Sequence, residues 1–300
     1  MILVVGEALV DVVQRPDGST AQHAGGSPAN VAVGLGRLGI DVTLVASLGD
    51  DRYGQLIRAH LDAHGVRLAN QPVTRTASAI AHLGDDGSAT YDFDIAWDPG
   101  RIDLPNGVTV VHTGSIGATL APGAADVEDL VRRLAPSAIV TFDPNVRPTL
   151  IDDDREDAVA RTERFITLAD VVKVSVEDVA WLRPEEAPDD VACGWAEAGP
   201  AIVVLTRGAQ GSTAFTRSGR VDAAAAPTRV VDTIGAGDSF MAGLITALHD
   251  EGLLKAAERP ALRTIDRETL TRVTSFATRA AAWVVSRSGA QSPSREQLSP

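Results

Sequence analysis

Cysteine is almost absent from this sequence of 300 residues, which contains only Cys193. A single cysteine cannot form a disulfide within the chain, and no Asn-x-Ser/Thr triplet offers a site for secretory glycosylation. The apolar amino terminus lacks a basic flank and is interrupted by Gly6, Glu7 and Asp11, so it predicts a buried strand rather than a signal sequence. These absences predict a cytoplasmic protein.

Long uncharged apolar segments are missing too. A helix needs about 18 such residues to cross a bilayer, and Arg, Asp or Glu interrupts every alanine-rich stretch. Positive charge is scarce, and the formal net charge is −13 at pH 7. Because such a chain repels nucleic-acid phosphates and acidic membrane surfaces, we expect neither nucleic acid nor membrane as a partner.

Short apolar runs alternate along the chain with segments of helical spacing. The runs lie at 2–5, 42–46, 108–111, 138–142, 171–174 and 201–206, and the helical segments at 28–38, 51–64, 123–135, 154–168, 176–183, 236–250 and 267–286. This alternation predicts an α/β fold with a mainly parallel sheet and helices on both faces. Since no long linker interrupts it, residues 1–300 are predicted to form one domain.

One region breaks this alternation. Ser78–Leu83 and Ala89–Phe93 are strand-like, and the turn residues 84–87 separate them. The sequence therefore predicts a β-hairpin inserted into the α/β chain. The residues alone leave open whether the hairpin is functional or only an edge decoration.

The strongest local motif lies at 231–243, where a glycine-rich turn leads directly into an apolar helix. The amides of Gly235, Ala236 and Gly237 would face outward at the start of that helix, where the helix dipole favours an anion such as phosphate. Asp238 follows in the first turn, in a position to accept a proton from an attacking hydroxyl. Taken alone, the motif leaves helix capping open as the lesser alternative for Asp238.

A second motif, at 25–34, combines paired glycines with a helix start. Gly26 allows a ligand to approach the backbone, and the amide of Asn30 can recognise hydroxyl groups. Upstream, the carboxylate of Asp11 could accept hydrogen bonds from two sugar hydroxyls. The residues alone leave two alternatives to ligand binding: 25–34 could be only the start of a helix, and Asp11 could be only a turn residue.

Two further segments follow predicted strands and have the polar, glycine-rich character of a nucleotide groove. They are 203–211, which contains Thr206, Gly208 and Gly211, and 173–178, which begins with Lys173. In open α/β sheets, ligands bind at the carboxyl ends of the strands. Either segment alone is weak evidence.

Three other patterns are set aside. Residues 34–39 match G-x-G-x-x-G but lie within and after a predicted helix, which argues against NAD binding, and 113–117 lacks the first glycine of a serine-hydrolase elbow. Neither Lys173 nor Lys255 lies in a P-loop motif. The pair His60 and His64 has no third ligand in view, so no transition-metal site is predicted.

Together, the motifs at 25–30 and 232–243 resemble the two signatures of the ribokinase-like (pfkB) carbohydrate kinases, in the family's order and spacing. Within that family the chain is most similar to bacterial fructokinases. The resemblance implies a three-layer α/β/α core and a small β-sheet lid formed by about 12–24 and 74–98. It also implies transfer of the γ-phosphate of ATP to a sugar hydroxyl, with Asp238 as general base.

The resemblance implies further site residues. Those expected to form the anion hole are Gly235, Ala236 and Gly237; those expected to hold the sugar are Asp11, Gly26, Asn30, Asn145 and Arg147. Those expected to contact the nucleotide are Lys173, Ser175, Thr206, Gly208, Gly211, Gly237 and Thr278.

Family members bind Mg·ATP, and many also need a monovalent cation such as K⁺. The positions that match the monovalent site are Asp232, Ile234 and Gly289. The family's Asn-x-x-Glu magnesium motif is replaced here by Ser175 and Asp178, and the shorter Asp178 could hold Mg²⁺ only through water.

Residues 143–147 read Asp-Pro-Asn-Val-Arg, a string that resembles both fructokinases and 2-keto-3-deoxygluconate kinases. The acidic run Asp92–Asp94 in the second hairpin strand would repel a sugar acid, so a neutral sugar, fructose above all, is predicted. 2-Keto-3-deoxygluconate is the first alternative, then ribose, and a catalytically inactive sugar-binding regulator is the alternative from another class. The resemblance also implies a homodimer, because lid sheets often pair.

Overall fold

The computed structural model describes residues 1–83, 89–103, 106–151 and 155–298. Its main feature is a nine-stranded sheet with the order β13-β12-β11-β10-β9-β8-β1-β4-β5. The strands are β1 (Ile2–Val5), β4 (Val42–Leu48), β5 (Arg67–Pro72), β8 (Val110–Gly114), β9 (Ile139–Asp143), β10 (Val171–Ser175), β11 (Ile202–Thr206), β12 (Ser212–Thr216) and β13 (Gly219–Ala223). All neighbours pair in parallel except β11–β12 and β12–β13, so the mainly parallel sheet is confirmed.

Alternate residues of the central strands supply two hydrophobic cores. In β1, Ile2 and Val4 join one core, and Leu3 and Val5 join the other. Helices bury both faces, which explains why these strands are continuous apolar runs rather than alternating ones. The strands β5, β12 and β13 escaped prediction because none of them is a continuous apolar run.

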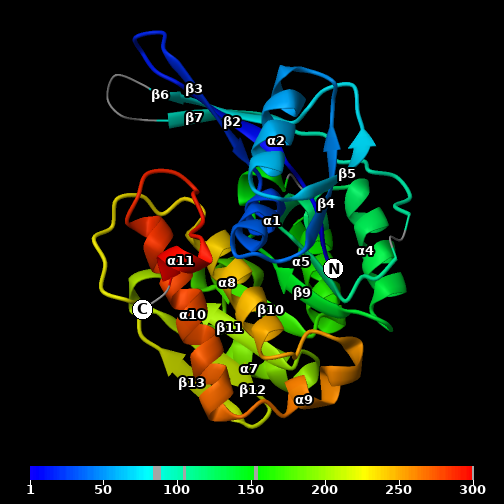
Figure 1. Cartoon of the computed structure of the whole chain (residues 1–300), viewed down its shortest axis with the longest axis vertical. Helices are drawn as coiled ribbons and strands as arrows, with labels where there is room; N and C mark the ends of the chain where they lie inside the picture. The colour runs from blue at the N-terminus through cyan, green and yellow to red at the C-terminus, as the bar shows by residue number, and fades with distance from the viewer. Residues whose placement is uncertain (84–88, 104–105, 152–154, 299–300) are drawn as a thin grey trace.

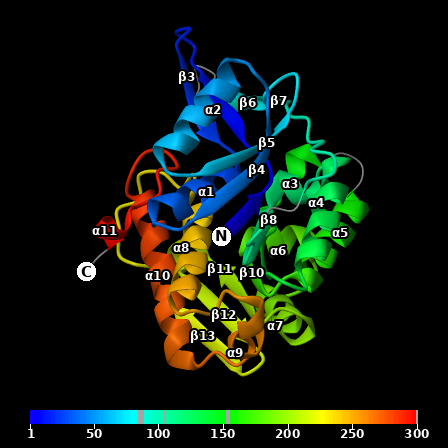
Figure 2. The ribbon, with the colours of Figure 1, turned by 45° about the vertical axis from the view of Figure 1, so that its right-hand side comes forward.

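Helices cover each face of this sheet (Figures 1 and 2). One core receives side chains of α1 (Ser27–Arg37), α2 (Arg52–Ala63), α8 (Ala236–Asp250) and α10 (Arg267–Val285), and the other those of α4 (Gly123–Leu134), α5 (Arg155–Leu168), α6 (Val176–Leu182) and α7 (Pro188–Ala198). The shorter helices are α3 (Ser115–Thr119), α9 (Arg259–Arg263), α11 (Arg295–Leu298) and the 3₁₀ turns η1 (Pro148–Leu150), η2 (Gly208–Gln210) and η3 (Ala256–Glu258).

All seven predicted helices are found, within a residue or two of their predicted ends. Helix α7 was not predicted, because its start at Pro188 lies inside the polar stretch 184–190, which lacks helical spacing of apolar residues. Within the described ranges, no helix is both long and apolar enough to span a membrane.

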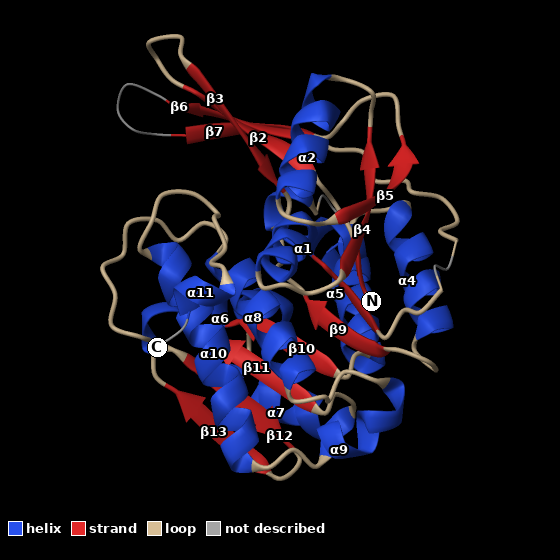
Figure 3. Cartoon of the chain, in the orientation of Figure 1, coloured by secondary structure: helices blue, strands red, loops and turns tan. Residues whose placement is uncertain are grey.

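A second sheet with the order β3-β2-β6-β7 stands at one end of the molecule, beside α2 (Figure 3). Its strands are β2 (Leu9–Gln14), β3 (Thr20–Gly25), β6 (Ser78–Leu83) and β7 (Ala89–Asp94). The predicted hairpin forms β6 and β7, and its turn lies outside the described residues. The β2–β6 pair is parallel while the other two pairs are antiparallel, so this sheet is mixed.

Candidate active site

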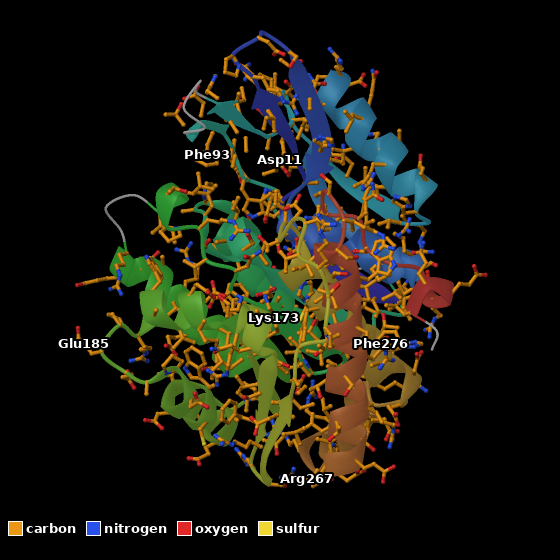
Figure 4. All side chains as sticks on the ribbon, turned by 90° about the vertical axis from the view of Figure 1, so that its left-hand side faces the viewer. Asp11, Phe93, Lys173, Glu185, Arg267 and Phe276 are labelled. Carbon is orange, nitrogen blue, oxygen red and sulfur yellow. The ribbon has the colours of Figure 1, made fainter. Side chains whose placement is uncertain are left out.

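The carboxyl ends of β1, β8, β9, β10 and β11 meet at one edge of the large sheet, as parallel pairing requires. Side chains that carry chemistry follow several of these strand ends. Figure 4 shows Lys173 on the large sheet and Asp11 and Phe93 on the small sheet above it. The predicted site residues thus come from two sheets.

The start of α8 supplies the predicted base. Gly235 adopts φ +74, and a Cβ atom there would lie 2.6 Å from Cβ of Ala290, so only glycine fits this turn. Asp238 lies in the first helical turn and is only 6% exposed. Its Oδ1 accepts a hydrogen bond of 2.7 Å from Ser27 Oγ, and its Oδ2 accepts one of 2.8 Å from Asn30 Nδ2. Both oxygens are therefore held in a fixed orientation.

The donors to Asp238 come from the first turns of α1. Gly26 precedes this helix with φ +98, and a Cβ atom there would meet the Glu7 carbonyl oxygen at 2.6 Å. Further along, a Cβ on Gly34 would lie 2.7 Å from Cβ of Ala242. The two helices therefore approach closely through small residues. Ser27 was not among the predicted site residues, since its neighbours indicate only a helix start.

A buried ion pair lies beneath the start of α8. Lys173 Nζ donates to both oxygens of Asp143, at 3.1 and 2.9 Å, and both side chains are almost fully buried. Burial raises the pKa of Asp143 to about 6, against the opposing charge of Lys173. Burial opposes the charge of Lys173, but Asp143 and Asp178 together raise its pKa.

The ammonium of Lys173 also fills the space where Gly237 lacks a side chain. A Cβ atom on Gly237 would lie 2.9 Å from Lys173 Nζ. Positive charge thus adjoins the amides at the start of α8, where the helix dipole already favours an anion. Asp143 was not predicted as a site residue, although it opens the string 143–147.

Asp178 forms a capping box at the start of α6. Its Oδ2 accepts from the Ser175 amide at 2.9 Å and from the Ser175 hydroxyl at 2.7 Å, and its Oδ1 accepts from the Val146 amide at 2.8 Å. The capping box accounts for the occurrence of Ser175 and Asp178 at this spacing without a metal ion. Among the described residues no group of three or more His, Cys, Asp or Glu side chains could hold a metal ion.

A row of side chains crosses the small sheet. The strand register places His23 opposite Asp11, Asp11 beside Ala79, and Ala79 opposite Phe93, so these four residues share one face. Asp11 packs against Gly25, where a Cβ atom would meet its Oδ2 at 2.1 Å. Asp11 is open to solvent on one side, yet desolvation raises its pKa, while the charges of His23 and Arg147 lower it.

The structure corrects our argument about the acidic strand. Asp92 and Asp94 alternate with Phe93, so they lie on the opposite face from Asp11. There Asp92 pairs with His82 at 2.8 Å, and Asp94 pairs with Arg75. These carboxylates therefore do not face the row that contains Asp11, and their ion pairs weaken any repulsion of a ligand bound against it.

The segment after β9 brings Asn145 and Arg147 to the same region. Asn145 has φ +37, a left-handed conformation that asparagine tolerates. Arg147 Nη1 donates to Asn145 Oδ1 at 2.8 Å. The positive charge of Arg147 lowers the pKa values of Asp11 and Glu7. Arg147 therefore lies between the small sheet and the end of β1.

A cavity of about 610 Å³ opens beside α8. It brings together five residues expected to contact the nucleotide: Thr206, Gly208, Gly211, Gly237 and Thr278. The remaining lining is mostly alanine, valine, proline and threonine from 225–233 and from α10. These lining residues escaped prediction because small apolar side chains carry no sequence signature.

The turn at Asp232 connects the chain before α8 with the segment after α10. The Asp232 carboxylate accepts from the amides of Ile234 at 3.0 Å and of Gly289 at 2.9 Å. These hydrogen bonds lower its pKa. The three residues predicted for the monovalent site are thus neighbours in the structure.

Comparison with known proteins identifies the chain. The model of the pfkB family carbohydrate kinases matches residues 1–297. The chain belongs to the pfkB family. It is therefore a phosphotransferase that acts on a sugar hydroxyl.

Among curated relatives, the fructokinase of Rhizobium leguminosarum bv. trifolii is 35% identical over 266 residues, which cover 85% of this chain and 81% of the relative. The fructokinase of Xylella fastidiosa, solved with bound ATP, has a TM-score of 0.89 and 28% identity, with 99% of this chain and 96% of that chain covered. A double mutant of the Vibrio cholerae O395 fructokinase, solved with fructose, ADP and a potassium ion, has a TM-score of 0.82 at 23% identity, with 99% and 96% covered. At that identity the last likeness shows the fold alone.

Two of the patterns set aside above, residues 34–39 and the pair His60 and His64, can be located in the structure. Gly34 and Gly36 lie within α1, and Gly39 follows it, so the G-x-G-x-x-G match belongs to a helix rather than to a strand-to-helix turn. His60 and His64 contact each other edge-to-face, with ring centroids 4.8 Å apart.

Proposed function

We propose that this pfkB kinase transfers the γ-phosphate of ATP to a hydroxyl of a neutral sugar, with fructose as the best-supported substrate. The observation that carries the proposal is the setting of Asp238. Its carboxylate is oriented by Ser27 and Asn30, adjoins the amide-lined start of α8, and belongs to the same site as Asp11. A base, an anion-binding helix start and a hydroxyl acceptor thus occur together.

In the proposed mechanism, Asp238 accepts the proton of the attacking sugar hydroxyl. The amides of Gly235, Ala236 and Gly237 would stabilise the charge that develops on the transferring phosphoryl group, and the Ala236 amide would exchange its bond to the Thr233 carbonyl for this role. Lys173 adds a fixed positive charge next to Gly237, and Asp143 holds the ammonium in place. Proton acceptance and charge stabilisation are thus both proposed at the start of α8.

The cavity beside α8 is the proposed nucleotide site. Its small apolar lining suits the faces of an adenine ring, and Gly208 and Gly211, with φ +54 and +88, form a turn that a nucleotide can approach closely. The Xylella fastidiosa fructokinase was solved with bound ATP, which supports ATP as the nucleotide. Ser175, which lies in the α6 cap, is proposed on the same side.

Magnesium fits this site only in a water-coordinated form. Asp178 already accepts three hydrogen bonds, and Mg²⁺ usually keeps several waters and takes few protein ligands beside substrate phosphates. Asp178 would hold it through water, and the ion would neutralise charge on the β- and γ-phosphates. A monovalent cation is proposed at Asp232, Ile234 and Gly289, which hydrogen bonds from the Ile234 and Gly289 amides to the Asp232 carboxylate bring together.

The sugar is proposed to bind between the two sheets. Asp11 would accept hydrogen bonds from its hydroxyls. The side-chain oxygen of Asn30 could do the same, since Asn30 bonds Asp238 through Nδ2 and no donor to its oxygen occurs among the described residues. Gly26, Asn145 and Arg147 complete the proposed contacts. We further propose that the small sheet acts as a lid over the sugar, and that two chains pair through it.

2-Keto-3-deoxygluconate remains a second candidate substrate, and a specific observation favours it. Among the residues that the structure describes, Arg147 has no carboxylate within ion-pair distance, and Asp92 and Asp94 lie on the far face of the small sheet. A substrate carboxylate could therefore be neutralised by Arg147. The preference for fructose rests on the relatives and on Asp11.

An ADP-release assay with fructose, 2-keto-3-deoxygluconate, ribose, tagatose and adenosine tests the proposal. We expect the highest kcat/KM with fructose or a similar neutral ketose. A preference for 2-keto-3-deoxygluconate would overturn the assignment and identify Arg147 as the carboxylate contact. No turnover with any sugar would favour the inactive regulator.

A further inference from the structure

Glu7 is a buried carboxylate that the mechanism above does not use. It follows β1 and is only 3% exposed. Its Oε1 accepts from the Ser27 amide at 3.3 Å, and its Oε2 accepts from the Gly117 amide at 2.8 Å. One side chain therefore connects the first residue of α1 with the third residue of α3.

Ser27 carries the link from Glu7 to the proposed base. Its amide donates to Glu7, and its hydroxyl donates to Asp238 Oδ1 at 2.7 Å. We propose that Glu7 is a positioning residue for phosphoryl transfer: its ionised carboxylate holds Ser27 so that the Ser27 hydroxyl orients Asp238. This inference rests on the proposed role of Asp238 as the base.

Tight packing makes the link stiff. A Cβ atom on Gly6 would lie 2.4 Å from Cγ of Pro28, and one on Gly117 would lie 2.6 Å from Cα of Gly6. The turn that carries Glu7 is therefore wedged between α1 and α3. Because this packing leaves no free space, a displacement of the Glu7 carboxylate also displaces Ser27.

The charge on Glu7 is open to change near neutral pH. Burial raises its pKa to about 7, although hydrogen bonding with its own amide, the Gly117 amide and the Ser115 side chain, together with the charge of Arg147, lowers it. The first turns of α1 and α3 contribute no acidic side chain, and the other ionisable groups of this part of the site are Asp11 and His23 on the small sheet and Asp238 behind Ser27. A protonated Glu7 keeps one full acceptor for two amides, so one of the two contacts is lost.

The test compares Glu7→Gln with the wild-type chain, by kcat from about pH 5.5 to about pH 8.5. Wild-type kcat should fall as the pH decreases through about 7. Glu7→Gln presents one acceptor and one donor to the two amides, as protonated Glu7 does. Its kcat should be about 10-fold to 100-fold lower at high pH, as expected for a misplaced catalytic group. The fall in kcat toward low pH, the acidic limb of the profile, should disappear. The KM for ATP should stay the same.

Asp170→Asn is the matched control, because Asp170 is also buried, at 4% exposure, but lies away from the site. Its carboxylate accepts hydrogen bonds from the Val140 amide and from Arg259. It should lower Tm and keep the acidic limb. A Glu7→Gln variant with a lower Tm but wild-type kcat and limb overturns the inference, as does a wild-type profile without the limb. If Glu7→Gln does not fold, Glu7→Asp replaces it: the retained carboxylate should keep the limb at a reduced kcat, and a wild-type kcat would contradict the inference.

Asp238→Asn in the same assay separates the two proposals. If it retains turnover, the proposed base is wrong whatever Glu7 does. If it is inactive while Glu7→Gln behaves as wild type, only the positioning role fails.

Discussion

Lys173 Nζ lies 2.9 Å from Asp143 Oδ2, in a nearly solvent-free position beneath the start of α8. Lys173→Met would leave Asp143 as a buried carboxylate without its cation. Because the Asp143 pKa is already about 6, it would rise further, and the group would be neutral at low pH but ionised at high pH. We expect a destabilisation of about 3–5 kcal/mol at high pH and a clearly smaller one at low pH.

Urea unfolding near pH 5 and near pH 8 measures this difference. The double variant Asp143→Asn/Lys173→Met is the control, since it has no charge left to titrate and should show no such pH dependence. Equal destabilisation of Lys173→Met at both pH values would show that Asp143 is stabilised by other groups.

Asp238→Asn should lower kcat by about 10²–10⁴-fold, the usual contribution of a positioned base. The amide keeps the size of the side chain but cannot take the hydroxyl proton, so the affinities for ATP and sugar should change only a few-fold. Turnover in the ADP-release assay and calorimetric binding of each substrate separate these effects. A loss of less than tenfold would reduce Asp238 to a helix cap.

Asp11→Ala should raise the KM for the sugar and spare the KM for ATP. Each charge-assisted hydrogen bond lost to a sugar hydroxyl costs about 1.5–3 kcal/mol, so the increase in KM should exceed tenfold. Asp17→Ala, on the exposed turn that follows the same strand, is the matched control and should leave both constants unchanged. Equal damage to both Michaelis constants by Asp11→Ala would indicate misfolding of β2 instead.

Phe93→Ala should raise the KM for the sugar several-fold, because Phe93 shares a face with Asp11 and offers an apolar surface to a sugar ring. Its neighbour provides the control. Asp92→Asn lies on the other face, beside His82, and should change the sugar KM less than twofold. Steady-state kinetics of the two variants decides which face of the small sheet meets the substrate; a larger effect of Asp92→Asn would reverse our assignment.

The sequence was sufficient to predict the parallel sheet, the main helices and the hairpin, because each depends on local periodicity. The motif at 232–243 also indicated Asp238 correctly as a residue at the start of a helix. The direction of Asp92 and Asp94 could not be obtained in the same way. It depends on the register between β6 and β7 and on which face packs against α2, and neither is encoded in β7 itself.

Contacts between residues far apart in the sequence could not be predicted from local sequence patterns either. Ser27 and Asp238 are 211 positions apart, and nothing in the sequence around Ser27 distinguishes a partner of Asp238 from a helix start. Glu7 was overlooked for a similar reason, since its two amide donors come from α1 and α3. Asp178 matched a metal motif approximately, yet its capping role follows from the three-residue spacing to Ser175.

The contact between α1 and α8 can form only late during synthesis of the chain. The ribosome makes β1 and α1 early, whereas α8 emerges only after most of the large sheet has been translated. Until then the face of α1 around Gly34 has no Ala242 to cover it, and the hydroxyl of Ser27 has no carboxylate to bind. Contacts of such high sequence separation close late and slowly. If Asp238 is the base, as proposed, a nascent chain cannot turn over ATP before α8 has docked.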